Sequence, residues 1–470
     1  MDDGRQVFAS PAAVCHWHLR AMAFGPGPDR MGPMRMTTAR EAIGDTVAGP
    51  VLGLAALLLG GCIFQDVREQ QALMDATCVI EGTAASAAAT DRPIVVALLR
   101  PAGDSAPGRE WLVADHFVLE AAGPWAFAAP PGEYRHAAFE DSNRDLRYQP
   151  GEPFLGVEAA APIRCTAGTK TRGIALRISA SSAGAPASER DVVSLQARDV
   201  HGQMRRTLGQ LTAAGELAQL ADARFARDVA ESGLWRPFDF VAASYAGIYM
   251  LEPDDPRKTP VLFVHGIQGT PASFETLAAK LDRSRFQPWF YYYPSGVHLD
   301  EIADHLAQTV AKVTRRHPHD RLVVVAHSMG GLVARGFLLR HARSAGAARV
   351  PLFVTISTPW DGHKAAEIGV KRAPAVVRVW EDMSPGSTYL REIFEQPLAA
   401  GTPHHLLFTY RRDSRSFGAS DDEAVTVASQ LRSAAQQGAS RLYGFDATHV
   451  GVLREPEVSA LLNRLLAEAR

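Results

Sequence analysis

The stretch "VVVAHSMGGLVARG", residues 323–336, joins an apolar run to an apolar helical pattern through a serine. The run of small and branched apolar residues is typical of a buried strand, and the residues after Gly331 have helical spacing. Ser328 therefore stands at a strand-to-helix corner, where its hydroxyl projects clear of the sheet edge. Ala326 and Gly330 are small enough for strand and helix to approach closely there. The sequence predicts that Ser328 is a nucleophile.

A second glycine-containing loop follows an earlier predicted strand in "VLFVHGIQGTP". His265 and Gly266 come directly after this strand, and the loop resembles the oxyanion loop of lipases and esterases. The resemblance implies that the backbone N–H groups of Ile267 and Met329 stabilise the negative charge of a tetrahedral intermediate. One such donor lowers the barrier by about 3 kcal/mol. We expect His265 to tie the loop together rather than to react.

A nucleophilic serine needs a base and a residue that orients the base, and in this kind of fold they follow in the order Ser, acid, His. His449 lies in "GFDATHVGVL", in a loop between the last predicted strand and the last helix, and is the predicted general base. The segment "SDDEAVTVASQ" resembles the part of lipases that carries the acid, and its alignment favours Asp422. Asp421 and Asp413 remain alternatives.

Between residues 259 and 470 the sequence alternates apolar strands with helices. The predicted strands are "PVLFVHG", "PWFYYY", "RLVVVAH", "PLFVTIS", "HHLLFTY" and "RLYGF". This pattern predicts a mostly parallel sheet with helices on both faces, and such a sheet carries its sites at the carboxyl ends of its strands. With the elements above, the sequence resembles the α/β-hydrolase superfamily, specifically bacterial serine lipases and esterases. The resemblance implies an α/β-hydrolase fold and acyl-transfer chemistry, and no cofactor is expected.

An inserted helical stretch at about residues 361–402 is the predicted cap. It carries apolar side chains such as Trp380 and Met383, so it is either a lid that meets lipid or an ordinary cap packed over the sheet. Trp360, in the turn "TPW" just before this stretch, resembles a residue that faces the substrate pocket in related lipases. It is predicted to line an acyl-binding wall, and a buried hinge aromatic is the alternative.

Residues 1–61 are predicted to be an N-terminal extension and a signal peptide. The stretch "VAGPVLGLAALLLGGC" is short for a membrane span and typical of the apolar region of a signal peptide. Its ending resembles the lipobox of bacterial lipoproteins, which implies cleavage before Cys62 and acylation of its thiol, and Ile63 favours the outer membrane. We expect an outer-membrane lipoprotein that faces the periplasm or the surface, with a plain secretory signal as the alternative. Met34 and Met36 are candidate translation starts.

Residues 62–178 contain short alternating strands separated by turn clusters, which predicts a small all-β sandwich. The pattern loosely resembles the transthyretin-like sandwiches found beside bacterial secreted enzymes. Cys78 and Cys165 would be the two cysteines left in an oxidising compartment, and we expect a disulfide between them. Such a bridge contributes roughly 4 kcal/mol in the chain-entropy treatment. Two unpaired buried thiols are the alternative.

The segment "DSNRDLRYQPGE" has the spacing of a calcium loop. Asp141, Asn143, Asp145 and Glu152 occupy places 1, 3, 5 and 12 of such a loop, where their oxygen atoms can converge on one hard cation. Leu146 stands where the calcium loop needs Gly, and the flanking residues favour strands. A structural calcium site is therefore a weaker expectation than an acidic turn between strands.

Residues 179–258 are predicted to be a linker followed by bracing helices. Ser, Ala and Pro dominate the linker, and from about residue 192 the leucines have helical spacing, at Leu208, Leu211, Leu217 and Leu220. Over the whole chain of 470 residues, 49 Lys and Arg balance 51 Asp and Glu. Because this balance produces no strong field, no nucleic-acid partner is expected.

Together these features predict a serine hydrolase that cleaves carboxylic esters, with an ester or lipid as substrate and a membrane bound through the N-terminal lipid anchor. Two alternatives remain. An acyltransferase or a peptidase could use the same three residues, or the chain could be a non-catalytic protein that binds an envelope partner. A retired site would be expected to lose at least one of Ser328, Asp422 and His449, which argues against the non-catalytic alternative.

Overall fold

The computed structural model describes residues 63–87, 92–101, 111–119, 122–143, 148–149, 151–156, 161–179, 212–343, 347–412, 415–416 and 419–469. The chain divides into two compact units, Met1–Glu69 and Gln70–Arg470. Of the first unit only residues 63–69 are described, and they are helical. The predicted signal peptide and Cys62 therefore lie outside the described residues, as do residues 180–211 of the predicted linker. Within the described ranges, no helix combines the length and the apolar composition that a membrane span requires.

The amino-terminal part of the second unit consists of two small sheets that share one core. The first sheet has the order β4 (Gly123–Ala129), β1 (Cys78–Ser86), β8 (Lys170–Ile178). The second has the order β3 (Trp111–Leu119), β2 (Ile94–Pro101), β5 (Gly132–Glu140), β6 (Phe154–Leu155), and β7 (Ile163–Cys165) also pairs with β5. Ile80 and Phe127 of the first sheet share a buried core with Val96 and Ala138 of the second. The predicted all-β region is confirmed.

A disulfide joins β1 to β7 in this region. The sulfur atoms of Cys78 and Cys165 are bonded, and their Cα atoms lie 5.7 Å apart although 87 residues separate them in the sequence. Both cysteines are buried in the shared core. By closing so long a loop, the expected bridge restricts the unfolded chain and so stabilises the folded one.

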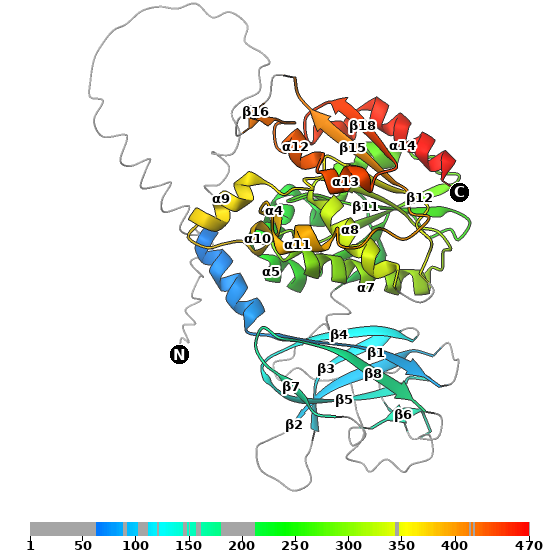
Figure 1. Cartoon of the computed structure of the whole chain (residues 1–470). Coiled ribbons are helices and arrows are strands. Elements are labelled where there is room, and N and C mark those ends of the chain that lie inside the picture. The colour runs from blue at the N-terminus through cyan, green and yellow to red at the C-terminus, as the bar shows by residue number, and fades with distance from the viewer. Residues whose placement is uncertain are drawn as a thin grey trace, which may run out of the picture. The chain divides into compact units, whose positions relative to one another are not determined.

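The carboxyl-terminal part of the second unit is built on an eight-stranded sheet (Figure 1). Its order is β18 (Arg441–Asp446), β15 (His404–Tyr410), β14 (Phe353–Ile356), β13 (Val323–His327), β11 (Thr259–Val264), β12 (Phe286–Tyr292), β10 (Gly247–Met250), β9 (Ala213–Leu217). The strands from β18 to β12 are parallel, β10 runs antiparallel to β12, and β9 runs parallel to β10. The parallel strands coincide with the predicted apolar segments, so the predicted mostly parallel sheet is confirmed.

Helices cover both faces of this sheet. Val261 and Phe263 share a core with side chains of α6 (Glu275–Ala279) and α14 (Pro456–Glu468). The helices α7 (Leu299–Arg316) and α8 (Met329–His341) pack against each other and contact β10, β11 and β13. Because successive side chains of a strand point to opposite faces, the buried residue Leu262 faces this second layer. Burial on both faces explains why these strands are mostly apolar.

The helix predicted over about residues 192–231 is wrong at residues 213–217, which lie in the part of it that the structure describes. Residues 213–217 form β9, whose Ala213 lies opposite Gly247 of β10. Gly215 has a φ of 80°, which a right-handed helix does not contain. Leu217 is 53% exposed and belongs to no packed stripe. Backbone pairing with β10 thus overrides the helical spacing at these residues, and the α-helices that follow in the described part are α4 (Arg227–Trp235) and α5 (Pro237–Ala242).

Three short helices form the region predicted as a cap. They are α9 (Lys364–Arg372), α10 (Arg378–Met383) and α11 (Thr388–Glu392). Phe394, just after α11, contacts the guanidinium groups of Arg335 on α8 and of Arg432, at 4.2 and 4.9 Å from its ring centroid. Arg335 also donates a hydrogen bond to the carbonyl of Ile393 at 2.7 Å. The carboxyl-terminal end of the cap is therefore anchored to the helix that follows Ser328.

Candidate active site

Ser328 lies at the turn between β13 and α8, as the sequence predicts. Its backbone has φ 55° and ψ −133°, a region that L-residues rarely adopt. The turn needs small neighbours, because a Cβ on Gly330 would lie 2.3 Å from the carbonyl oxygen of Val264 and one on Gly266 would lie 2.7 Å from the Ser328 Cβ. The side chain of Ser328 is thus held in a strained corner at the carboxyl edge of the sheet.

The structure brings the three predicted side chains together. Ser328 Oγ lies 2.8 Å from His449 Nε2, and His449 Nδ1 lies 2.8 Å from Asp422 Oδ2. Since a carboxylate can only accept, His449 Nδ1 carries the proton and Nε2 is free to accept the proton of the serine hydroxyl. Ser328 follows β13, His449 follows β18, and Asp422 lies after β15, so all three meet at the carboxyl ends of strands.

The carboxylate of Asp422 is fully buried and accepts five hydrogen bonds. The donors are His449 Nδ1 at 2.8 Å, the Thr409 hydroxyl at 2.5 Å, the Gln430 side-chain amide at 3.1 Å, and the backbone N–H groups of Ala424 at 3.1 Å and Val425 at 2.7 Å. Burial acts to raise the pKa of Asp422, but His449, together with the hydrogen bonds from Thr409 and Val425, outweighs it and holds this pKa below its ordinary value. Asp422 therefore remains ionised beside His449.

The other two candidate acids do not take this place. Asp421 is buried, and its Oδ1 accepts the backbone N–H of Glu423 at 3.0 Å. Its carbonyl accepts the N–H of Arg411 at 2.7 Å. Asp413 lies outside the described residues. The carboxylate that reaches His449 is that of Asp422, the residue favoured by the sequence pattern.

His265 holds the loop after β11, as expected. Its Nδ1 donates to the carbonyl of Gly266 at 2.7 Å, and its Nε2 accepts the N–H of Tyr293 at 3.3 Å. Its ring stacks on Tyr293 with centroids 4.1 Å apart. Burial lowers the pKa of His265 to about 4, so the ring is neutral near pH 7. Gln268, whose φ is 52°, donates its N–H to Ser295 Oγ at 3.1 Å, which fixes the tip of the loop.

The two predicted oxyanion donors flank the serine. Ile267 follows Gly266, which lies in close contact with Ser328, and Met329 is the residue after Ser328. Among the hydrogen bonds of the described residues, none uses the N–H of Ile267 or that of Met329. Both groups are therefore available to an external acceptor next to the serine hydroxyl.

Three supporting residues have no assigned role in the sequence analysis. Thr409 on β15 and Gln430 at the end of α12 (Val427–Gln430) hold Asp422, and His327 donates from Nε2 to the carbonyl of His449 at 2.8 Å. The position of His327 directly before Ser328 was a usable signal. The sequence offers no comparable signal for Thr409 or Gln430, because their contacts with Asp422 depend on how the loop after β15 folds back.

Trp360 is fully buried in this structure. Its ring makes edge contacts with Phe394 and His404, with centroids 5.6 Å apart in both cases. These contacts fit the alternative of a buried hinge aromatic. A role for Trp360 in an acyl-binding wall stays a prediction.

The predicted calcium loop is only partly described. Asp145 lies outside the described residues. Glu152 accepts the backbone N–H groups of Ser142 at 2.7 Å and Gln149 at 2.9 Å, so its oxygens tie the turn itself. In the parts of the chain that the structure covers, no group of His, Cys, Asp and Glu is arranged to hold a metal ion. A calcium ion bound by Asp141 and Asn143 together with these residues stays a prediction.

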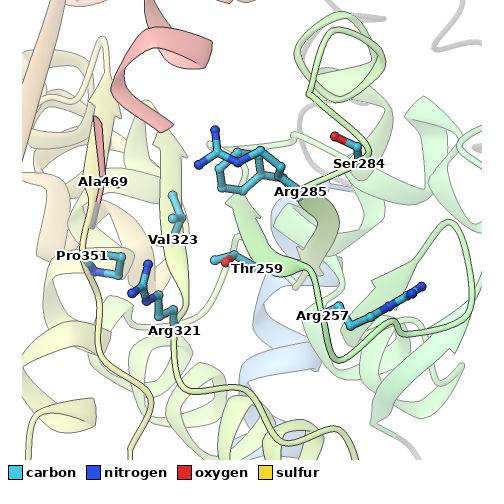
Figure 2. A pocket seen from close by; sticks show the side chains of 9 residues that line it. Arg257, Thr259, Ser284, Arg285, Arg321, Val323, Pro351 and Ala469 are labelled. Carbon is cyan, nitrogen blue, oxygen red and sulfur yellow. The ribbon is translucent and has the colours of Figure 1, made fainter. Parts of the chain in front are cut away.

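A pocket of about 190 Å³ lies at the opposite, amino edge of the sheet (Figure 2). Thr259, Phe286 and Val323, the first residues of β11, β12 and β13, line it. The arginines Arg257, Arg285 and Arg321 also line it, and Figure 2 shows Arg257 directed away from the other two. Because Ser328 follows the other end of β13, this pocket is separate from the candidate active site.

Part of the chain matches a known family model. Residues 259–381 match the family model described as alpha/beta hydrolase fold. Similar solved structures include the mature lipase BlEst2 of Bacillus licheniformis (17% identity, 46% of this chain and 94% of that chain, TM-score 0.37), Aspergillus fumigatus lipase B (16%, 49% and 57%, 0.37) and a carboxylesterase of Nitrososphaera gargenis (13%, 47% and 94%, 0.34). No curated protein matches the chain. The family match and the eight-stranded sheet show that the chain contains a domain of the α/β-hydrolase fold.

Proposed function

We propose that this protein is a serine hydrolase that cleaves carboxylic esters through an acyl-enzyme. The observation that carries the proposal is the continuous chain of hydrogen bonds from Ser328 Oγ through His449 to Asp422, with 2.8 Å at each step. Such a chain makes a serine hydroxyl nucleophilic, because the imidazole accepts its proton as the new bond forms.

The proposed reaction has two halves. Ser328 Oγ attacks the ester carbonyl while His449 Nε2 takes its proton, and the N–H groups of Ile267 and Met329 bind the oxyanion. His449 then gives the proton to the leaving alcohol, and the acyl group remains on Ser328. Water, deprotonated by His449, repeats the attack and releases the acid and the free serine. The buried carboxylate of Asp422 stabilises the imidazolium that forms in each half.

The surface around the serine supports an acyl group of medium length or a lipid as substrate. Ile267 on the oxyanion loop is 36% exposed, and Val450, directly after His449, is 56% exposed. Exposed apolar surface is a sign of a binding site where it is contiguous and borders a functional site. The place of Ile267 and Val450 beside the two loops of the site favours a substrate with an apolar acyl chain.

A panel of p-nitrophenyl esters of increasing acyl length tests the proposal. We expect the soluble mature protein to hydrolyse these esters with a preference for medium chains, and Ser328→Ala to lose the activity. Hydrolysis that survives Ser328→Ala would reject Ser328 as the nucleophile. A preference for the shortest chains would reject the lipid-like substrate and leave a small-ester esterase.

We also propose that the protein is anchored to the bacterial envelope through a lipid on Cys62. The supporting observation is the sequence "LLGGC" at the end of the apolar stretch. Two or more acyl chains give stable membrane attachment, whereas a single chain binds only reversibly. Cys62→Ser should release the protein into the soluble fraction, and attachment that persists in this variant would contradict lipidation.

A further inference from the structure

His327 precedes the nucleophile in the sequence and contacts the backbone of the base in space. Its side chain is 6% exposed, at the end of β13. From there Nε2 reaches the backbone carbonyl of His449 at 2.8 Å, and the two imidazole rings lie 4.9 Å apart between centroids. The reaction described above leaves this contact without a role.

The protonation of His327 is fixed by its surroundings. A carbonyl oxygen can only accept, so the proton of the neutral ring sits on Nε2. Burial, together with the neighbouring His449, lowers the pKa of His327 to about 3. The ring is therefore a neutral donor over the pH range in which a serine hydrolase works, and it does not compete with His449 for protons.

The backbone of His449 is held on both sides. Its N–H donates to the carbonyl of Asp422 at 2.8 Å, and its C=O accepts from His327. The next residue, Val450, is 56% exposed. These two hydrogen bonds, one to the N–H and one to the C=O, hold the backbone of His449 in place. The direction of its ring is set by the hydrogen bond from Nδ1 to Asp422.

We infer that His327 is a positioning residue, which holds the loop of the base at the distance where His449 Nε2 meets Ser328 Oγ. The inference rests on the proposed function. Through this hydrogen bond, His327 connects the turn that carries the serine to the loop that carries the base, although His327 and His449 are 122 residues apart in the sequence. A shift of about 1 Å in the base can cost on the order of 100-fold in rate, so a single backbone hydrogen bond can matter at this point.

Three substitutions at position 327 test the link. Gln places an amide N–H near the position of the imidazole Nε2, Asn is too short to reach, and Leu removes the donor while keeping the bulk. We expect His327→Asn and His327→Leu to lower kcat by about 10-fold to 100-fold with little change in KM. His327→Gln should recover most of that loss.

His341 provides a matched control. It is also a buried histidine whose Nε2 donates to a backbone carbonyl, that of Ala348, at 2.8 Å. It lies at the far end of α8, roughly 20 Å from Ser328 at 1.5 Å per residue. His341→Asn should lower the melting temperature at least as much as His327→Asn does and should leave kcat unchanged.

The outcomes separate the two levels of the proposal. Wild-type protein that is inactive on every ester and does not react with a fluorophosphonate would overturn the proposed function, and this inference with it. Active wild-type protein with undiminished His327→Asn and His327→Leu variants would overturn the role of His327 alone. Equal losses in kcat for the Gln and Leu variants would also overturn it, because a donor at the Nε2 position would then make no difference.

Discussion

The eight-stranded sheet has a carboxyl edge, where its parallel strands end, and an amino edge, where they begin. The polar groups at these two edges are held in different ways. At the carboxyl edge, Asp422, His265 and His327 are buried, and each makes hydrogen bonds to neighbouring loops. At the amino edge, Arg285 and Arg321 line an open pocket and are exposed to solvent. Groups held by several neighbours inside the protein keep their orientation during a reaction, whereas solvated side chains must be reordered.

This difference shows why the pocket and the candidate active site need not coincide. The amino-edge pocket is lined by first residues of strands, such as Thr259, where the chain enters the sheet. The carboxyl edge offers the ends of strands, where loops can fold over one another and bring distant residues together. Buried and partnered polar groups are thus a better indicator of chemistry here than the open pocket is.

Removing the negative charge of Asp422 is the strongest test of this comparison. Asp422→Asn keeps the shape but places an amide where His449 Nδ1–H needs a carboxylate, so we expect kcat to fall on the order of 10⁴-fold. Asp421→Asn is the matched control one residue away, and kcat should fall less than about tenfold. Both variants are measured with the preferred p-nitrophenyl ester. Losses of equal size would contradict the assignment of Asp422.

Part of the pH dependence of stability should reside at the carboxyl edge. Burial lowers the pKa of His265 to about 4 and that of His327 to about 3, whereas an unfolded histidine titrates near 6.5. As the pH falls below 6.5, the unfolded chain binds protons that these folded rings do not. The free energy of unfolding therefore decreases by up to about 1.4 kcal/mol per pH unit for each ring, until its folded pKa is reached.

His327→Gln tests this pH dependence, because it keeps a donor and removes the titrating ring. Denaturant unfolding between pH 7 and pH 4 should show a smaller decrease in the free energy of unfolding than in the wild type. The arginines at the amino edge stay protonated throughout this range and contribute nothing to the difference. An identical pH dependence in both proteins would show that the ring is not buried as described.

Much of the carboxyl edge could be predicted from the sequence, because its key residues follow strands with strong apolar patterns. Ser328, His449 and Asp422 are each placed by such a strand and by the order in which they occur. The supporting contacts could not be predicted, because Thr409 and Ser295 act through loops whose path no spacing rule describes. The helix predicted at residues 213–217 was wrong for a related reason. These residues form a strand because they pair with residues 247–250, and local spacing does not show such a distant partner.

Ser295 offers a smaller effect at the same edge. Its hydroxyl is 1% exposed and accepts the N–H of Gln268, next to the oxyanion donor Ile267. Ser295→Ala leaves that N–H without its partner, so kcat/KM should fall about fivefold to tenfold, as expected for one neutral hydrogen bond. Ser284→Ala, at the amino-edge pocket, removes an exposed hydroxyl and should change kcat/KM by less than about twofold. Equal effects would remove the distinction between the two edges.

The smallest effect is expected for the arginines of the pocket. Arg285→Gln and Arg321→Gln each remove one exposed positive charge at the start of a strand, roughly 17 Å or more from Ser328, since a strand rises about 3.3 Å per residue. At 0.15 M salt this distance is about twice the Debye length, so the field of either charge at His449 is largely screened. The kcat and its pH profile should therefore remain within about twofold of the wild type, alone and in the double variant. A tenfold change in kcat would contradict this expectation. It would mean that the two edges are coupled through the structure of the sheet, because a screened charge cannot produce an effect of that size.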